Sequence, residues 1–243
     1  MLRKRFEMEV REELRKVHNL NERELPGLLA GYLESSGLPH DPQNLLIRWA
    51  DSKIRRGPRW MNVDMTQINT PAPFRSVYIK GRFLGIPLEG LDTYSGGHGE
   101  MTIRALKFLK VAEERGDPMD VSALVTLLSE APFLPSLFLA ECTEWSQLDD
   151  ERVEGRIRDH GITASGLFTF DEHGRFLKFY TEDRYCAEFN MEQHPWSVEV
   201  LSYRDTGGFI YPTECTATWH LPEGDLKYFH GRIGDARFNI RTL

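Results

Sequence analysis

Residues 152–170 read RVEGRIRDHGITASGLFTF, and this stretch predicts an antiparallel hairpin closed by a two-residue turn at His160-Gly161. The register that this turn imposes pairs Val153 with Phe168 at the far end of the hairpin. Apolar side chains then share one face of the two strands, and charged or hydroxyl side chains share the other. The apolar face consists of Val153, Ile157, Ala164 and Phe168. The stretch therefore indicates a sheet with one buried face and one face in water.

Further alternating segments lie on both sides of this hairpin, and Gly, Pro and Asp clusters separate them. The apolar residues of 101–111 also fit a helical spacing, but the neighbouring strands favour a strand there. A looser segment is expected at 190–195 and a turn at 205–208. The additional strands are predicted at 45–55, 60–68, 74–80, 86–94, 101–111, 176–181, 196–203, 209–221 and 226–240.

Long sequential strands and a few helices predict an α+β fold built on one large curved antiparallel sheet. A sheet of roughly ten strands must curl, so we expect a half-barrel with a concave face. Residues 41–243 are predicted to form a single antiparallel β domain with a helical insert at 117–140. Because the insert is apolar, we expect it to lie over the concave face as a lid.

Residues 1–40 are predicted to be a helical segment that packs on the main domain. Its first helix carries an apolar stripe of Phe6, Val10, Leu14 and Val17 at helical spacing. A second helix is expected between Pro26 and Gly37. The helices of this segment, like the insert, are available to cover the concavity. The narrow first stripe also allows an alternative, a homodimer formed through the N-terminal helix.

The composition excludes several classes of protein. The chain has 243 residues, of which 40% are hydrophobic and 11% aromatic, which is too apolar for a disordered chain. Three widely spaced cysteines do not make a disulfide scaffold. Because 37 Asp and Glu outnumber 30 Lys and Arg, we expect no nucleic-acid partner. Acidic residues interrupt the start of the chain and no run is long enough to span a bilayer, so we expect a cytoplasmic protein without a membrane span.

Several short strings, taken together in their order and spacing, resemble a bacterial family, the domain of unknown function numbered 6544. The resemblance covers residues 25–238 and implies no activity or catalytic residue. In outline the half-barrel with its lid is similar to periplasmic lipoprotein carriers, which hold acyl chains under a helical lid. The expected absence of a signal peptide argues against a periplasmic role. The strings are GPRWM (57–61), DTY (92–94), GHGEM (97–101), EAPFLP (130–135), FDEHG (170–174), PWS (195–197) and WHLPEGD (219–225).

Catalytic and metal motifs are weak along the chain. No Gly-x-Ser-x-Gly elbow, HExxH or CxxC spacing occurs, and no glycine-rich loop has a phosphate-binding context. Cys215 lacks a neighbouring cation, so we expect a packed thiol. His220 and His230 flank one hairpin, and an even-length turn places them on opposite faces, whereas a bulge would bring them together. We therefore expect no metal, no cofactor and no assigned catalytic residue.

Acidic side chains in or beside the strands leave one enzymatic alternative open. They are Asp64, Asp92, Glu100, Glu130 and Glu214. Two carboxylates under aromatic walls are able to perform general acid and base catalysis. The alternative is therefore a hydrolase-like enzyme that uses a pair such as Asp92 and Glu214, with or without a metal at His220.

The aromatic residues favour a different function, because many of them lie within the predicted strands or at their ends. If part of this set lines the concave face, it forms an apolar pocket with a few polar groups, the usual composition of a small-molecule site. Our leading hypothesis is a non-enzymatic protein that binds an apolar or amphipathic small molecule, and a protein interaction module is a further alternative. The predicted lining is Trp60, Asp92, Tyr94, Trp145, Tyr203, Glu214 and Trp219.

Overall fold

The computed structural model describes residues 1–186, 189, 191–206 and 208–243. Asn190, in the predicted looser segment, and Gly207, in the predicted turn at 205–208, lie outside the described residues. The helices are α1 (Leu2–Glu13), α2 (Gly27–Ser36), α3 (Asp117–Ser129) and a 3-10 helix, η1 (Pro135–Leu139). The strands are β1 (Leu45–Arg56), β2 (Arg59–Thr70), β3 (Phe74–Phe83), β4 (Ile86–Ser95), β5 (His98–Ala105), β6 (Leu109–Glu114), β7 (Thr143–Gln147), β8 (Arg152–Asp159), β9 (Ile162–Phe170), β10 (Phe176–Thr181), β11 (Tyr185–Cys186), β12 (Glu192–Gln193), β13 (Trp196–Asp205), β14 (Ile210–Leu221) and β15 (Gly224–Phe238).

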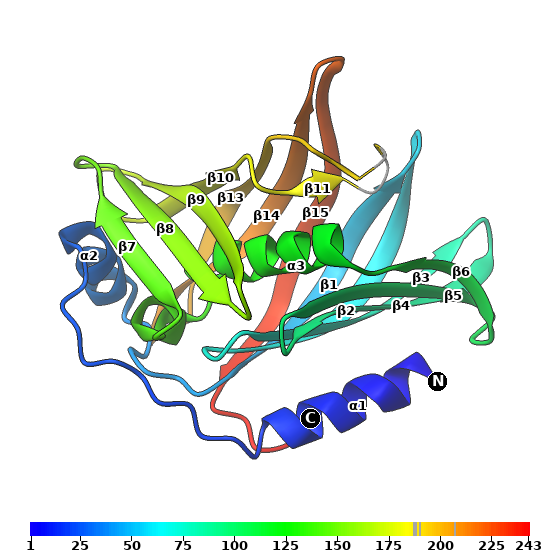
Figure 1. Cartoon of the computed structure of the whole chain (residues 1–243), viewed down its shortest axis with the longest axis horizontal. Helices are drawn as coiled ribbons and strands as arrows, with labels where there is room; N and C mark the ends of the chain where they lie inside the picture. Colours follow the sequence, from blue (N-terminus) through cyan, green and yellow to red (C-terminus); the bar gives the residue numbers. More distant parts are fainter. Residues whose placement is uncertain (187–188, 190, 207) are drawn as a thin grey trace.

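Thirteen strands form one open antiparallel sheet in the order β6-β5-β4-β3-β2-β1-β15-β14-β13-β10-β9-β8-β7. The first six strands and the last seven are two meanders, and the pairing of β1 with β15 joins them at the centre. The sheet curls strongly, and α3 lies across its concave side (Figure 1). The predicted fold class, a large curved antiparallel sheet with a helical lid, is confirmed.

The hairpin at 152–170 has the predicted register. Val153 pairs with Phe168, and Gly155 pairs with Gly166. Both His160 and Gly161 have positive φ, as the tight turn requires. All four residues of the predicted apolar face are fully buried. Gly155 and Gly166 have no side chains, and their space is filled by aromatic rings from the neighbouring strands.

The two faces of the sheet have different helical covers. We call the face toward α3 the inner face and the opposite one the outer face. Helix α2 closes one end of the concavity, where Tyr32 packs against Phe138 and Phe170. Helix α1 instead buries Leu2 and Phe6 in a separate apolar cluster with outer-face residues of β1 to β4. The expectation that the first helix covers the concavity is therefore wrong.

Helix α1 also ends earlier than its apolar stripe suggests. It stops at Glu13, and Val17 is exposed in the connecting segment that follows. The helix is fixed to the outer face by Arg5, whose Nη1 and Nη2 donate to the two carboxylate oxygens of Glu100 at 2.7 and 2.8 Å. This bidentate pair joins the start of the chain to β5.

Residues 101–111, predicted as one strand, form two strands. A turn separates β5 from β6, and Leu106 and Lys107 both adopt positive φ there. Neither residue is Gly, Asn or Asp, the types that normally mark such a turn. The strand character was predicted correctly, but the sequence carries no sign of the reversal.

We predict that Gly166→Ala destabilises the fold. A Cβ at Gly166 would overlap the Phe179 ring and lie 2.9 Å from the Tyr180 carbonyl oxygen. The expected loss is about 1 to 3 kcal/mol in the free energy of unfolding, measured by urea denaturation. The matched control is Gly31→Ala in α2, where a Cβ meets nothing within 4 Å. That control should gain up to about 1 kcal/mol, and equal effects of the two substitutions would contradict the packing argument.

A second prediction concerns the pH dependence of the α1 contact. Hydrogen bonds from Arg5 above all, and also from Thr102 and Arg115, lower the pKa of Glu100 from 4.5 to about 2 despite its partial burial. The contribution is therefore present above pH 4.5 and is lost as the pH falls toward 2. Glu100→Gln should cost about 1 to 2 kcal/mol of unfolding free energy at pH 7, because Arg5 is partly exposed.

The difference between wild type and Glu100→Gln should shrink as the pH falls, when unfolding is followed by circular dichroism. Glu12→Gln, on the exposed side of the same helix, serves as control and should leave stability unchanged. A difference that stays constant down to pH 2 would show that Glu100 contributes through packing rather than charge.

Candidate functional site

A cavity of about 330 Å³ lies between α3 and the inner face of the sheet. This volume is at the lower end of the range for small-molecule sites. Because strand residues alternate between faces, the inner positions of β2 and β3 supply an apolar wall that includes Met65, Val77 and Ile79. Val198 and Ala217 continue the wall on β13 and β14.

Two contacts hold α3 over this cavity. Near the start of the helix, the Gly99 backbone N–H donates to Asp120 Oδ1 at 2.7 Å. A Cβ at Gly99 would overlap the Met119 carbonyl oxygen, so glycine allows the helix to approach β5 closely. Just beyond the other end of the helix, Glu130 contacts Arg75 of β3. The helix therefore touches the sheet at both ends.

A polar network closes the deep end of the cavity, on the part of β2 to β4 that is remote from the hairpin turns at 57–58 and 84–85. Arg75 Nε donates to Glu130 Oε1 at 3.0 Å, and Arg75 Nη1 donates to Asp92 Oδ2 at 2.7 Å. Gln67 Nε2 and Asn69 Nδ2 both donate to Glu130 Oε2, at 2.8 and 2.6 Å. The network thus presents polar side chains below an apolar wall.

Arg75 is nearly completely buried, yet it stays charged. Burial is the largest influence and by itself would lower the pKa of the guanidinium. The carboxylates of Glu130 and Asp92 more than offset burial, and the pKa of Arg75 is raised above its ordinary value. One cation therefore contacts two carboxylates in a region of low dielectric.

An aromatic cluster lies at the opposite end of the cavity, toward the β14–β15 turn. The Arg184 guanidinium stacks 4.3 Å from the Trp196 ring centre and 4.9 Å from that of Trp219. Arg184 Nη1 donates to the Tyr228 hydroxyl at 2.9 Å. Arg55 and Arg56 of β1 also line this side of the cavity. The end is therefore aromatic and cationic. The acidic lining residue Glu114 lies away from it, in register with Met101 and Asp92.

The structure places two of the predicted site residues, Asp92 and Trp219, on this cavity. Trp60 is instead 43% exposed at the tip of the β1–β2 hairpin. Tyr94 is fully buried on the inner face, where its hydroxyl donates to Asp159 Oδ2 at 2.8 Å. These two residues therefore do not line the cavity.

The other three predicted residues also lie elsewhere. Trp145 packs edge-on against Phe138 with ring centres 5.0 Å apart, in the core beside α2. The Tyr203 hydroxyl donates to the Phe176 carbonyl oxygen. Glu214 lies on the outer face, because it is one residue from Cys215, which lines the cavity. Five of the seven residues that the sequence predicted to line the cavity therefore do not line it.

The acid pair of the enzymatic alternative does not form. Asp92 is on the inner face, bound to Arg75, whereas Glu214 is on the outer face and contacts His230 and Arg232. The sheet backbone separates the two carboxylates. Asp92 and Glu214 therefore cannot act on one substrate.

The two histidines at the β14–β15 hairpin lie on the same face, contrary to the even-turn expectation. A bulge in β15 shifts the register between Thr218 and Ala217, so that His230 pairs with Thr216. His220 and Thr216 are then both on the outer face, roughly 13 Å apart at about 3.3 Å per residue. In the part of the chain that the structure describes, no three His, Cys, Asp or Glu side chains form a metal site.

One arrangement on the outer face has the geometry of a catalytic triad. Ser197 Oγ lies 2.9 Å from His220 Nε2, and His220 Nδ1 lies 2.8 Å from Asp225 Oδ1. A nucleophile must be reachable by its substrate, but Ser197 is only 1% exposed. We therefore interpret these contacts as a structural hydrogen-bond chain that ties β13 to β14 and to the β14–β15 turn.

Cys215 lies on the cavity wall as a packed thiol. Burial above all, and also the nearby carboxylates of Glu130 and Glu214, raise the pKa of Cys215 to about 12. At neutral pH the group is a small apolar surface rather than a nucleophile.

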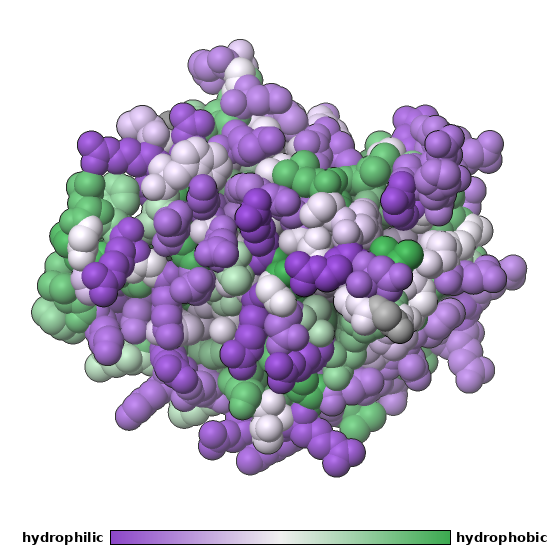
Figure 2. Space-filling model, turned by 180° about the vertical axis from the view of Figure 1, so that it is seen from behind, coloured by the Kyte–Doolittle hydropathy of each residue, from purple (hydrophilic) through white to green (hydrophobic). Residues whose placement is uncertain are grey.

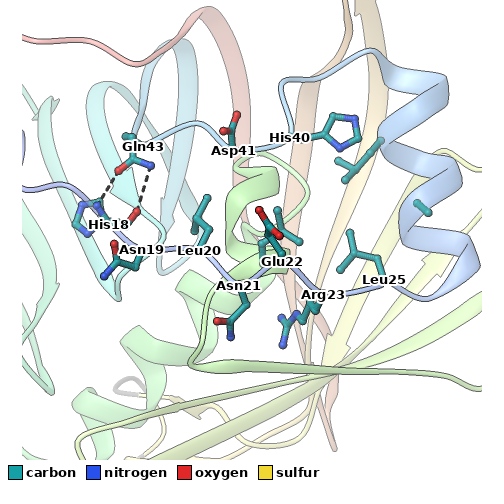
Figure 3. Close-up of a pocket in the computed structure, with 13 residues that line it drawn as sticks. His18, Asn19, Leu20, Asn21, Glu22, Arg23, Leu25, His40, Asp41 and Gln43 are labelled. Carbon is teal, nitrogen blue, oxygen red and sulfur yellow. Dashed lines mark hydrogen bonds between the residues drawn. The ribbon is translucent and has the colours of Figure 1, made fainter.

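A second, larger hollow of about 780 Å³ lies among the connecting segments 18–25 and 40–43 (Figure 3). The Gln43 side chain there accepts a hydrogen bond from the His18 backbone N–H at 2.7 Å and donates one to the His18 carbonyl oxygen at 3.3 Å (Figure 3). Burial lowers the pKa of His18. Because this hollow is open to solvent and is lined largely by the connecting segments themselves, we favour the cavity under α3.

The network at the deep end includes residues that the sequence analysis did not single out. Gln67, Asn69 and Arg75 lie on the inner face of the sheet. Gln67 and Arg75 each lie two residues along the strand from an apolar residue, Met65 and Val77 respectively. Polar side chains at strand positions that are otherwise apolar could have indicated this network from the sequence. Arg184 lies between two short elements and carried no such signal.

Comparison with known proteins gives a family and a fold. A family model described as a family of unknown function (DUF6544) matches residues 15–231. No curated protein matches the chain. A putative outer membrane lipoprotein-sorting protein domain from Vibrio parahaemolyticus has a similar structure, with a TM-score of 0.51, 12% identity, and coverage of 87% of this chain and 90% of that chain.

Two further solved structures are less similar. A LolA superfamily protein from Nitrosomonas europaea gives a TM-score of 0.45 at 13% identity, over 86% of this chain and 91% of its own. A DUF1329 family protein from Desulfovibrio piger gives 0.45 at 10% identity, over 88% and 91%. Among the described residues, no helix has the length and apolar character needed to cross a bilayer.

We predict that Arg75→Met strongly destabilises the protein, because it leaves two carboxylates near the cavity without their cation. The expected loss is about 3 to 5 kcal/mol of unfolding free energy, measured by urea denaturation. In the triple variant Arg75→Met, Asp92→Asn, Glu130→Gln, the charges are removed together, and at least half of the loss should be recovered. A triple variant no more stable than Arg75→Met would contradict the electrostatic account.

Proposed function

We propose that this chain, which belongs to the DUF6544 family, binds an amphipathic small molecule in the cavity under α3. The apolar part of the ligand lies along the inner-face wall formed by Met65, Val77, Ile79 and their neighbours on β13 and β14. Its polar group lies at the aromatic and cationic end, beside Arg184. The observation that carries the proposal is the cavity itself, about 330 Å³ of space between a lid helix and a largely apolar sheet face.

The cationic end supports an anionic polar group. Three arginines line that side, Arg55, Arg56 and Arg184. Arg184 Nε is buried without a hydrogen-bond partner, so an additional acceptor would satisfy it. Hydrogen bonds between a guanidinium and an anion are about twice as strong as neutral ones. We therefore infer a monocarboxylate or similar anion with an aliphatic or aromatic tail.

The fold likeness adds limited support. The Vibrio parahaemolyticus domain is named for lipoprotein sorting, but at 12% identity the likeness shows the fold alone. The present proposal depends on the cavity lining of this chain. The cytoplasmic location, the homodimer and the interaction module inferred from the sequence stay predictions.

We predict that Ile79→Trp strongly weakens ligand binding. Ile79 lines the cavity from β3, and a larger ring there should occupy the space that the ligand tail needs. The affinity for a dansyl-labelled undecanoic acid should fall by at least about tenfold, the loss expected when a tail worth about 1.4 kcal/mol or more is displaced. The readout is energy transfer from Trp49, Trp196 and Trp219, which line the cavity, to the dansyl group.

The matched control is Lys80→Trp, the next residue on β3, which is exposed on the outer face. It should bind the probe like the wild type. If Ile79→Trp unfolds the protein, Ala217→Leu replaces it as the blocking variant on β14. Folded blocking variants that bind as well as Lys80→Trp would overturn the proposal.

A further inference from the structure

Several hairpin tips project from one end of the sheet, and three of them belong to the first meander, β1 to β6. The neighbouring β14–β15 tip, with the exposed Glu223 and Asp225, is not part of the surface that these three tips form. We call residues 55–60, 82–86 and 106–111 the hairpin rim. They adjoin the turns of the β1–β2, β3–β4 and β5–β6 hairpins. The Leu106 backbone N–H donates to the Pro87 carbonyl oxygen at 3.0 Å, which joins the second and third tips directly. In Figure 1 the first hairpin rises at the upper right, and β3 to β6 extend to the right-hand edge.

The hairpin rim is unusually apolar for a surface. It holds seven of the fourteen large apolar side chains that are exposed among the described residues. Phe108 is 72% exposed and Leu84 is 69% exposed. Figure 2 shows hydrophobic residues gathered at its left-hand margin, the side on which β5 and β6 lie. The exposed apolar residues of the second and third tips are Leu84, Ile86, Leu106, Phe108, Leu109 and Val111.

The charge of the hairpin rim is opposite to that of the whole protein. The three segments contain six Lys or Arg and no Asp or Glu, whereas the chain carries a formal net charge of −7. The cations alternate with the apolar residues, as in Lys107, Phe108, Leu109, Lys110 and Val111. Exposed apolar side chains among cations are the composition of surfaces that enter the interface of an anionic bilayer.

We propose that the hairpin rim docks this protein on an anionic lipid bilayer. Phe108, Leu109 and Leu84 enter the region between headgroups and acyl chains, and the neighbouring lysines and arginines contact the lipid phosphates. The negative charge of the rest of the protein is repelled by the same surface, so docking through this end is favoured over other orientations.

A lipid surface fits the hairpin rim better than a second copy of the chain. Strand β6 is at the edge of the sheet, and an edge strand is able to pair with another strand. Pairing of two copies through β6 would engage only the third tip, because β1 to β4 are interior strands, and would leave Leu84 and the arginines of the first two tips uncovered. A lipid surface contacts all three tips, and its phosphates would neutralise their cations.

The docking inference extends the proposed function but does not depend on it. Arg55 and Arg56 belong both to the hairpin rim and to the cavity lining. The cavity therefore reaches the base of the hairpin rim. An amphipathic ligand would pass between membrane and cavity without crossing bulk water.

The test is flotation with vesicles of phosphatidylcholine, with and without phosphatidylglycerol. The wild type should bind the anionic vesicles at about 0.1 M salt and lose most binding at about 1 M, where the Debye length falls to about 3 Å. Lys107→Glu with Lys110→Glu should weaken binding at least tenfold, since each cation near an anionic surface contributes roughly fivefold. Phe108→Ser with Leu109→Ser should also lose at least about tenfold.

Leu148→Ser with Leu201→Ser is the matched control, because both leucines are more than half exposed away from the hairpin rim. This control should bind vesicles like the wild type. Ile79→Trp should also bind vesicles normally, so failure of cavity binding and failure of docking are distinguishable. No binding to anionic vesicles, or equal loss in the control, overturns the proposal. A dimer that dissociates in the Phe108→Ser, Leu109→Ser variant would assign the hairpin rim to self-association instead.

Discussion

The carboxylate of Glu130, just after α3, is held by three side chains of the sheet: Arg75, Gln67 and Asn69. Together with the contact of Asp120 to β5 at the other end, it fixes where the helix stands relative to the inner face. Between these contacts the helix and the sheet enclose the cavity. Arg75 also binds Asp92, so the same guanidinium supports the lid and forms the polar floor below the apolar wall.

The sequence predicted most of the fold because its strands obey a period of two over long stretches. The register of 152–170 followed from a single turn and alternating apolar residues. Features that change register without a typical turn residue were not predictable. The turn at Leu106 and Lys107 and the bulge in β15 are of this kind. The sequence also did not predict the face of the sheet on which α1 docks. Both faces of β1 are apolar, with Leu46 on the outer face and Ile47 on the inner face.

The candidate site was less predictable than the fold, since lining a cavity depends on strand face and on what fills the space. Asp92 and Trp219 line the cavity, whereas Trp145 and Tyr94 are packed in the core and Glu214 lies on the outer face. An aromatic residue in a strand does not reveal whether its neighbours leave a gap beside it. Polar residues that interrupt an apolar alternation, such as Gln67 and Arg75, would have been a better guide to the site.

The polar network of Arg75 lies at one end of the cavity, and the apolar wall extends from it. The exposed, cationic hairpin rim lies at the other end. The most direct test of the central claim is calorimetric binding of straight-chain monocarboxylates of increasing length. The account predicts a roughly fourfold gain in affinity for each added CH₂, from about 0.8 kcal/mol per group, until the 330 Å³ cavity is filled and the gain stops. It also predicts a negative heat-capacity change. Affinity that does not depend on chain length would contradict an apolar ligand in this cavity.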